Sequence, residues 1–164
     1  MINILKRVNK SPKCRLSLTI ISHASVLVTA FAYLFLLALT FFHESGARVG
    51  GELPMLLLGA GVPFILVSLA RHFINAPRPY ELYDFFETPP KAKRGHSFPS
   101  RHVFSSFVIA TLAIPTSQVL AGALYLIGIS LALSRVFLGI HFIRDVVAGA
   151  LIGIISGLIA IFIF

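Results

Sequence analysis

Charged residues and cysteine are scarce in this chain of 164 residues. Only 12% of the residues are charged, six residues are acidic, and Cys14 is the single cysteine. One cysteine cannot form an internal disulfide, and it lacks the spacing of a metal site. The 57% of apolar residues and the mean hydropathy of +0.90 instead predict an integral membrane protein.

The chain has many lysine and arginine residues for a protein so rich in apolar residues. Lysine and arginine together number 14, which gives a formal net charge of +8. In a nucleic-acid-binding protein these cations would form a patch on a soluble domain, whereas here they flank apolar segments. We therefore expect no nucleic-acid partner, and we expect the cations to meet the lipid bilayer and phosphate groups.

Long apolar runs alternate with polar or proline-rich segments. A helix needs about 20 apolar residues to cross a bilayer. The run from Val103 to Leu133 is too long for one crossing, and the sequence Pro115-Thr116-Ser117-Gln118 is typical of a turn within it. The sequence thus predicts an all-α, polytopic membrane bundle: a single domain over residues 1–164 with about five transmembrane helices and a short basic N-terminal segment at the interface. The expected spans lie near residues 16–42, 53–70, 100–114, 117–135 and 146–164, with a long loop at 71–99 that we expect to carry the active site.

Three glycines recur every four residues in the last expected span, at Gly149, Gly153 and Gly157. Small residues at this spacing let two helices approach closely. We expect this face to pack inside the bundle; the alternative is a homodimer formed through it.

Three groups of ionisable residues interrupt the apolar pattern. Such groups are costly at membrane depth and usually functional. With five spans, all three fall on the same side of the membrane. Together they contain Arg71, Arg78, Ser100, Arg101, His102, Arg135, His141 and Asp145.

These residue types suit a phosphate group. Several guanidinium groups in one place need an anion between them, and arginine binds phosphate oxygens with paired donors. Asp145 follows His141 by four residues, so its carboxylate can hold one ring nitrogen and leave the other free to attack phosphorus. His102 is then expected to protonate the departing oxygen. Because Asp145 is the only acidic residue in the three groups, we expect neither a metal ion nor a cofactor.

The same residues resemble the three-part signature of the type 2 phosphatidic acid phosphatase superfamily, written K-x6-R-P, P-S-G-H and S-R-x5-H-x3-D. The matching motifs are Arg71-x6-Arg78-Pro79, Pro99-Ser100-Arg101-His102 and Ser134-Arg135-x5-His141-x3-Asp145. The resemblance implies an integral membrane lipid phosphatase with His141 as nucleophile, Asp145 as its partner and His102 as the acid. It further implies that Arg71, Arg78, Ser100 and Arg135 hold phosphate.

Two positions depart from that signature. Arg71 stands where the family usually has lysine, which keeps the charge but replaces a point donor with a planar fork. Arg101 stands where the family usually has glycine, and its side chain is placed to contact a second phosphate or a headgroup. We therefore expect Arg101 to affect mainly the choice of substrate.

Three functions are consistent with the motifs. The first is a metal-independent phosphatase acting on a membrane lipid phosphomonoester or diphosphate, such as phosphatidylglycerol phosphate, phosphatidate or a polyprenyl (di)phosphate. The second is a lipid phosphotransferase that uses the same phosphohistidine. The third is a non-enzymatic, anion-binding membrane bundle. The aromatic residues Tyr80, Tyr83, Phe85 and Phe86 are expected to form an interfacial belt, or alternatively to line the way for an acyl or prenyl chain.

The distribution of lysine and arginine predicts the orientation. Without Arg71, Arg78, Arg101 and Arg135, nine of these residues lie on the side of the three groups, against Arg48 alone on the other. The positive-inside rule then places the N-terminus and the site on the cytosolic side of the cell membrane.

Overall fold

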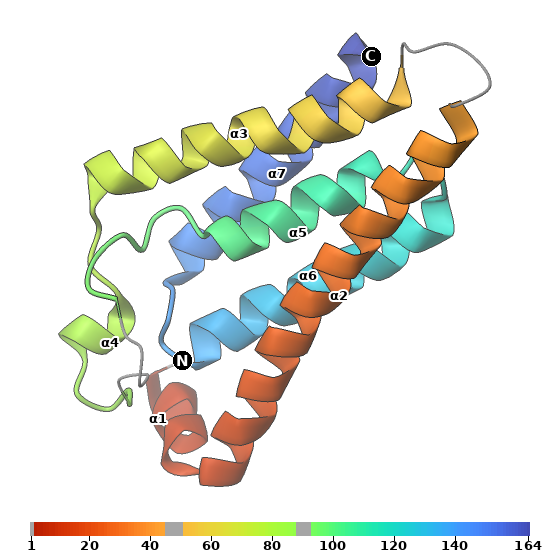
Figure 1. Ribbon diagram of the computed structural model, residues 1–164. Coiled ribbons are helices and arrows are strands. Elements are labelled where there is room, and N and C mark those ends of the chain that lie inside the picture. Colours follow the sequence, from red (N-terminus) through yellow and green to blue (C-terminus); the bar gives the residue numbers. More distant parts are fainter. Residues whose placement is uncertain (1, 45–50, 88–92) are drawn as a thin grey trace.

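The computed structural model describes residues 2–44, 51–87 and 93–164. Within these ranges the regular structure is helical, which confirms the predicted all-α bundle (Figure 1). The helices are α1 (Ile2–Lys10), α2 (Pro12–Glu44), α3 (Glu52–Ile74), α4 (Pro79–Leu82), α5 (Arg101–Leu112), α6 (Gln118–Phe137) and α7 (Ile143–Ile163). Arg48 and Lys91, both counted for the orientation, lie outside the described residues.

In the described part of the chain, four helices are long and apolar enough to cross a membrane: α2, α3 with its extension through α4, α6 and α7. Their outward faces carry large apolar side chains, including Phe31, Phe73 and Phe162, which are 71%, 80% and 92% exposed. An apolar surface of this extent is unfavourable in water and suits lipid. The chain is a multi-pass membrane protein.

The third pass, α5, is shorter than the expected span at 100–114. Its twelve residues rise about 18 Å, less than the roughly 30 Å thickness of the hydrocarbon core. Nine of the twelve are buried, and α5 contacts α2, α3, α6 and α7. Four of the roughly five expected crossings therefore have the length of a membrane span. The remaining one, α5, is a short helix inside the bundle.

The glycine face of α7 packs directly on α5. A Cβ atom at Gly149 would lie 2.6 Å from the carbonyl oxygen of Ser100, and one at Gly153 would lie 2.7 Å from that of Phe104. Only glycine permits so close an approach of two backbones. The face thus packs inside the bundle, against α5.

Several helices extend beyond their expected limits, and the extensions of α3 and α7 carry site residues. Helix α3 continues past residue 70 to Ile74, so Arg71 lies in its last turn. It ends at Asn75, which adopts a left-handed conformation (φ 42°) and donates its N–H to the Arg71 carbonyl. Helix α7 begins at Ile143 rather than 146, which places Asp145 in its first turn.

Candidate active site

The three charged groups meet at one end of the bundle, the end where α1 and α4 lie in Figure 1. The end of α3 supplies Arg71, and the start of α5 supplies Ser100 and His102. Arg78 directly precedes α4, and Arg101 is the first residue of α5. Arg135, His141 and Asp145 come from the end of α6, the turn after it and the start of α7. The backbone N–H of Ser100 donates to the Asp145 carbonyl (2.9 Å), so the second and third motifs are in direct contact.

His141 and Asp145 form the predicted pair. His141 is 2% exposed, and its Nδ1 lies 3.5 Å from Oδ2 of Asp145. The pair forms across the start of α7, because His141 precedes the helix and Asp145 caps it by accepting the N–H of Phe142 (3.0 Å). With Nδ1 turned to the carboxylate, Nε2 is the ring nitrogen left for attack.

The turn that presents His141 depends on glycine. Gly139 has φ +68°, and a Cβ atom there would lie 2.4 Å from the ring of Phe86. Directly after it, the N–H groups of Ile140 and His141 donate to the Arg135 carbonyl, at 3.0 and 3.2 Å. The backbone of Arg135 therefore fixes the position of His141.

Ser97 belongs to this constellation, although sequence reasoning did not identify it. Its side chain is fully buried, its Oγ donates to Oδ2 of Asp145, and the same Oγ lies 3.3 Å from Nδ1 of His141. Ser97 carries no charge and lies outside the spaced motifs. Its only sequence signal is its position two residues before Pro99.

The segment that leads into α5 is held by Arg71 and Asn75. Arg71 is 6% exposed and donates to the carbonyl oxygens of Ser97 (3.1 Å) and Pro99. The Asn75 side-chain oxygen accepts the N–H of His96 (3.2 Å). These contacts place Ser97 against Asp145.

Arg78 joins the same segment from the side of α4. Its Nε donates to the Gly95 carbonyl (3.0 Å), while Glu81 Oε1 accepts the N–H groups of Arg78 and Gly95, at 3.1 and 2.8 Å. The N–H of Tyr80 donates to the Gly139 carbonyl (3.1 Å). Helix α4 thereby connects the first motif to the turn that carries His141.

Two buried donors of the expected phosphate-binding residues lack a hydrogen-bond partner among the described residues: Ser100 Oγ and Arg135 Nε. A buried polar group without a partner costs free energy, so native proteins rarely retain one without a ligand or another function. Both residues adjoin the His141 pair through the backbone: the N–H of Ser100 donates to the Asp145 carbonyl, and the Arg135 carbonyl accepts the N–H of His141. The arrangement fits an oxyanion bound between them.

Burial lowers the pKa of His141 to about 4, and the positive charges of Arg78 and Arg71 add to this effect, whereas Asp145 opposes it. The imidazole is therefore neutral at physiological pH. A neutral imidazole with one nitrogen held by a carboxylate is a competent nucleophile.

No group of three or more His, Cys, Asp or Glu side chains that could hold a metal ion is found in the described ranges.

Comparison with known proteins identifies the family. Residues 52–164 match the PAP2 superfamily, and this region holds all three motifs. The chain belongs to the PAP2 superfamily. A search of curated proteins found no match.

Two solved structures share the fold. LpxE from Aquifex aeolicus has a TM-score of 0.71 and 25% sequence identity, and the alignment covers 97% of this chain and 93% of that one. The first transmembrane PAP2 type phosphatidylglycerolphosphate phosphatase from Bacillus subtilis has a TM-score of 0.56 and 24% identity, with 96% and 89% covered. The similarity extends over nearly the whole chain and includes α1 and α2, which precede the family match.

The two departures from the PAP2 signature have different surroundings. Arg71 uses part of its guanidinium to hold backbone carbonyls, a task for which a planar fork has more donors than an ammonium group. Arg101 turns toward α3, where its guanidinium carbon lies 5.8 Å from the ring centroid of Phe64. Phe64 is 41% exposed, so this contact lies at the surface of the bundle.

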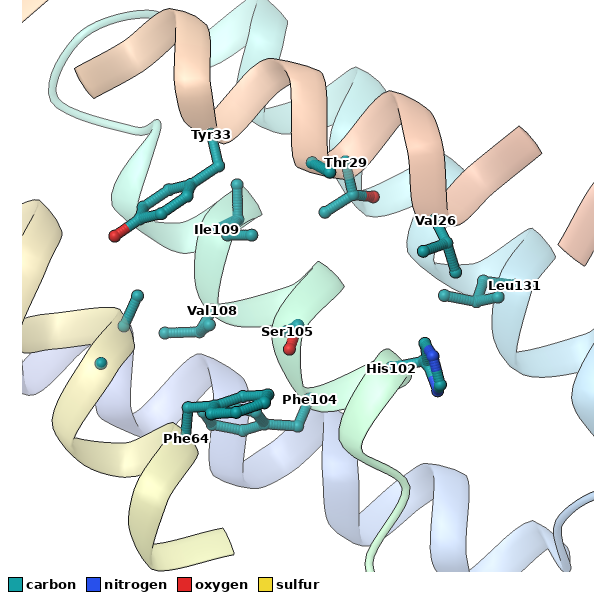
Figure 2. A pocket seen from close by; sticks show the side chains of 13 residues that line it. Val26, Thr29, Tyr33, Phe64, His102, Phe104, Ser105, Val108, Ile109 and Leu131 are labelled. Carbon is teal, nitrogen blue, oxygen red and sulfur yellow. The ribbon is translucent and has the colours of Figure 1, made fainter. Parts of the chain in front are cut away.

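His102 occupies the first turn of α5 and is exposed. It stands at one end of an apolar groove between α2, α3 and α5, as Figure 2 shows. The expected PAP2 site residues whose contacts join the three motifs are Arg71, Arg78, Ser100, Arg135, His141 and Asp145. His102 lines the groove, and Arg101 lies against Phe64 of α3.

Proposed function

We propose that this protein is a lipid phosphate phosphatase that acts through a phosphohistidine on His141 and needs no metal ion. The observation that supports this most directly is the buried pair of unpartnered donors, Ser100 Oγ and Arg135 Nε, beside an imidazole held by Asp145. Those donors suit phosphate oxygens, and the imidazole suits attack on phosphorus. Membership of the PAP2 superfamily and the likeness to a phosphatidylglycerolphosphate phosphatase agree with this reaction class.

The first step transfers the phosphoryl group to the protein. Nε2 of His141 attacks phosphorus, the bond from phosphorus to the lipid oxygen breaks, and His102 gives that oxygen a proton. The guanidinium groups of Arg71, Arg78 and Arg135 stabilise the negative charge on the other phosphate oxygens.

The second step releases phosphate. His102, now neutral, takes a proton from a water molecule, and that water attacks phosphorus as the bond to His141 breaks. His141 returns to its neutral form and His102 is protonated again. The lipid alcohol and inorganic phosphate are the two products, so atoms and charge balance over the cycle.

The proposed substrates are membrane lipids that carry a phosphomonoester or a diphosphate. One structural neighbour is a phosphatidylglycerolphosphate phosphatase, so phosphatidylglycerol phosphate is the first compound to try on this chain. Phosphatidate and a polyprenyl diphosphate complete the panel. We further propose, from the positive-inside rule, that the site faces the cytosol.

The test is phosphate release from this panel by the purified protein in micelles, with and without EDTA. We expect release from at least one lipid at the same rate in both conditions, and none with His141→Ala. A folded protein that releases no phosphate from any of the lipids would overturn the proposal. Transfer of phosphate to an added lipid alcohol in preference to water would identify a phosphotransferase instead.

A further inference from the structure

The apolar groove beside His102 is a cavity of about 330 Å³ whose walls come from α2, α3 and α5, with Leu131 of α6. Figure 2 shows it along α5, with Tyr33 near one end and His102 at the other. Val26, Phe64, Val108 and Ile109 supply apolar walls between these ends. The groove therefore begins at the expected general acid and continues into the apolar part of the bundle.

Two of the three side-chain hydroxyl groups that line this groove, those of Thr29 and Tyr33, already have partners; the third belongs to Ser105. Thr29 Oγ1 donates to the Ser25 carbonyl (2.8 Å) and lies 3.2 Å from Ser106 Oγ, while the Tyr33 hydroxyl donates to the Leu56 carbonyl (3.1 Å). A sugar or glycerol headgroup would gain little from hydroxyls that are engaged in this way. The walls offer hydrocarbon contact instead.

The geometry of phosphoryl transfer decides what this groove holds. The attacking and leaving atoms lie roughly in line on opposite sides of phosphorus. In the proposed reaction His141 attacks and His102 protonates the leaving oxygen, so the part of the lipid bonded to that oxygen begins beside His102. We propose that the groove between α2, α3 and α5 binds the hydrocarbon chain carried by the leaving oxygen, an inference that rests on the proposed function.

A second cavity competes for the chain. It has a volume of about 400 Å³, reaches His141 and is lined by Tyr83, Phe85 and Phe86, the aromatic residues expected either to form a belt or to guide a lipid chain. His141 lines it, and in-line transfer puts the leaving oxygen on the opposite side of phosphorus from His141. In a phosphomonoester the other oxygens carry no substituent, so no chain can start there.

The size of the groove limits its content. Ligand sites commonly measure about 300–1,000 Å³, so a groove of 330 Å³ lies at the small end. It suits one hydrocarbon chain. In a two-chain lipid, the second chain would stay in the bilayer.

Gly61 offers a way to fill the groove. It lies on α3 and lines the groove, and a Cβ atom added to it would have no atom within 4 Å. Gly122 on α6 is a matched control, because it is also helical, also has open space at the Cβ position and does not line the groove. Ala30 lines the groove from α2, so Ala30→Leu narrows it from the opposite wall.

The experiment compares kcat/KM for n-decyl phosphate with that for n-butyl phosphate in the same micelles. Each buried methylene contributes about 0.8 kcal/mol, or about fourfold, so excluding two or more should change the ratio at least about tenfold. We expect Gly61→Leu and Ala30→Leu to lower the decyl-to-butyl ratio by that factor. Gly122→Leu should keep the native ratio. Partition of the substrates into micelles cancels, because it is the same for every variant.

An unchanged ratio in both groove variants would overturn the inference while leaving the phosphatase intact. The same would follow if Gly122→Leu lowered the ratio as much as Gly61→Leu. Absence of activity toward both alkyl phosphates in the native protein and toward the lipid panel would overturn the proposed function itself, so the two failures are distinguishable.

Discussion

Asp145 accepts contacts from three directions, and this makes His141 a defined nucleophile. The carboxylate faces Nδ1 of His141, the hydroxyl of Ser97 and the N–H of Phe142. The spacing of four residues was enough to predict the histidine and its carboxylate, because both are rare in an apolar chain. Ser97 could not be predicted in the same way, since a serine in a polar loop has many ordinary uses and its contact depends on how the loop folds.

The protonation state of His141 is the first prediction. Burial lowers its pKa to about 4 from an ordinary 6.5, so the neutral, nucleophilic form should persist as the pH falls from 7 to about 5. NMR of protein with labelled histidines can follow the ring, with the signal assigned through its loss in His141→Ala. A ring that titrates near 6.5 would contradict the buried arrangement.

The second prediction concerns Ser97 as a positioning residue. Removing a hydrogen bond to a charged group typically costs about 1.5–3 kcal/mol, so Ser97→Ala should lower kcat by roughly tenfold to a hundredfold. KM should change little, because Ser97 does not touch the substrate, and Ser97→Thr should restore part of the rate. Ser130→Ala is the control, since that hydroxyl donates to the Leu126 carbonyl of its own helix, outside the site. Equal kcat values in Ser97→Ala and the native protein would remove this role.

At the scale of helices, the contact between α5 and α7 determines the distance between the second and third motifs. The four-residue glycine repeat predicted a close helix contact, but it could not identify the partner, because the sequence does not say which helix faces the glycines. The pattern of apolar residues also could not predict that α5 is shorter than a membrane span. That pattern is the same for a helix buried in protein and for one exposed to lipid.

The third prediction tests this contact. A Cβ atom at Gly153 would lie 2.7 Å from the Phe104 carbonyl and 2.9 Å from the Val108 nitrogen, and backbone atoms cannot turn aside. Gly153→Ala should destabilise the protein by about 1–3 kcal/mol through overpacking, partly offset by the better helix propensity of alanine. Thermal unfolding in micelles measures the change. Gly122→Ala, with open space around it, should unfold at the native temperature or slightly above, and a Gly153→Ala protein of native stability would contradict the packing.

Across the whole molecule, the chain reverses direction so that every charged motif reaches the same end. Counting apolar runs was sufficient to predict this arrangement, because an even number of passes separates the first motif from the third. The ends of the helices were harder to predict, because Arg71 and Asp145 were expected to lie outside them. In the structure α3 includes Arg71 and α7 includes Asp145, since both side chains have partners in the site.

The fourth prediction concerns orientation. In a Cys14→Ser background, Lys93→Cys places a thiol on the exposed active-site segment, and Gly51→Cys places one at the opposite end of the bundle. A cytosolic site predicts that an impermeant maleimide labels Gly51→Cys in intact cells and labels Lys93→Cys only after permeabilisation. The reverse pattern would show that the site faces outward.

The most direct measurement for the account as a whole is the capture of the phosphorylated protein. His102→Gln lacks the base that activates water, whereas para-nitrophenyl phosphate has a leaving group that needs no proton, so the first step should proceed and the second should stall. We predict a burst of about one nitrophenol per protein molecule, with phosphate found on His141 after an alkaline quench and peptide mapping. A protein that turns over without a burst, or that carries the phosphate on any residue other than His141, would contradict the account.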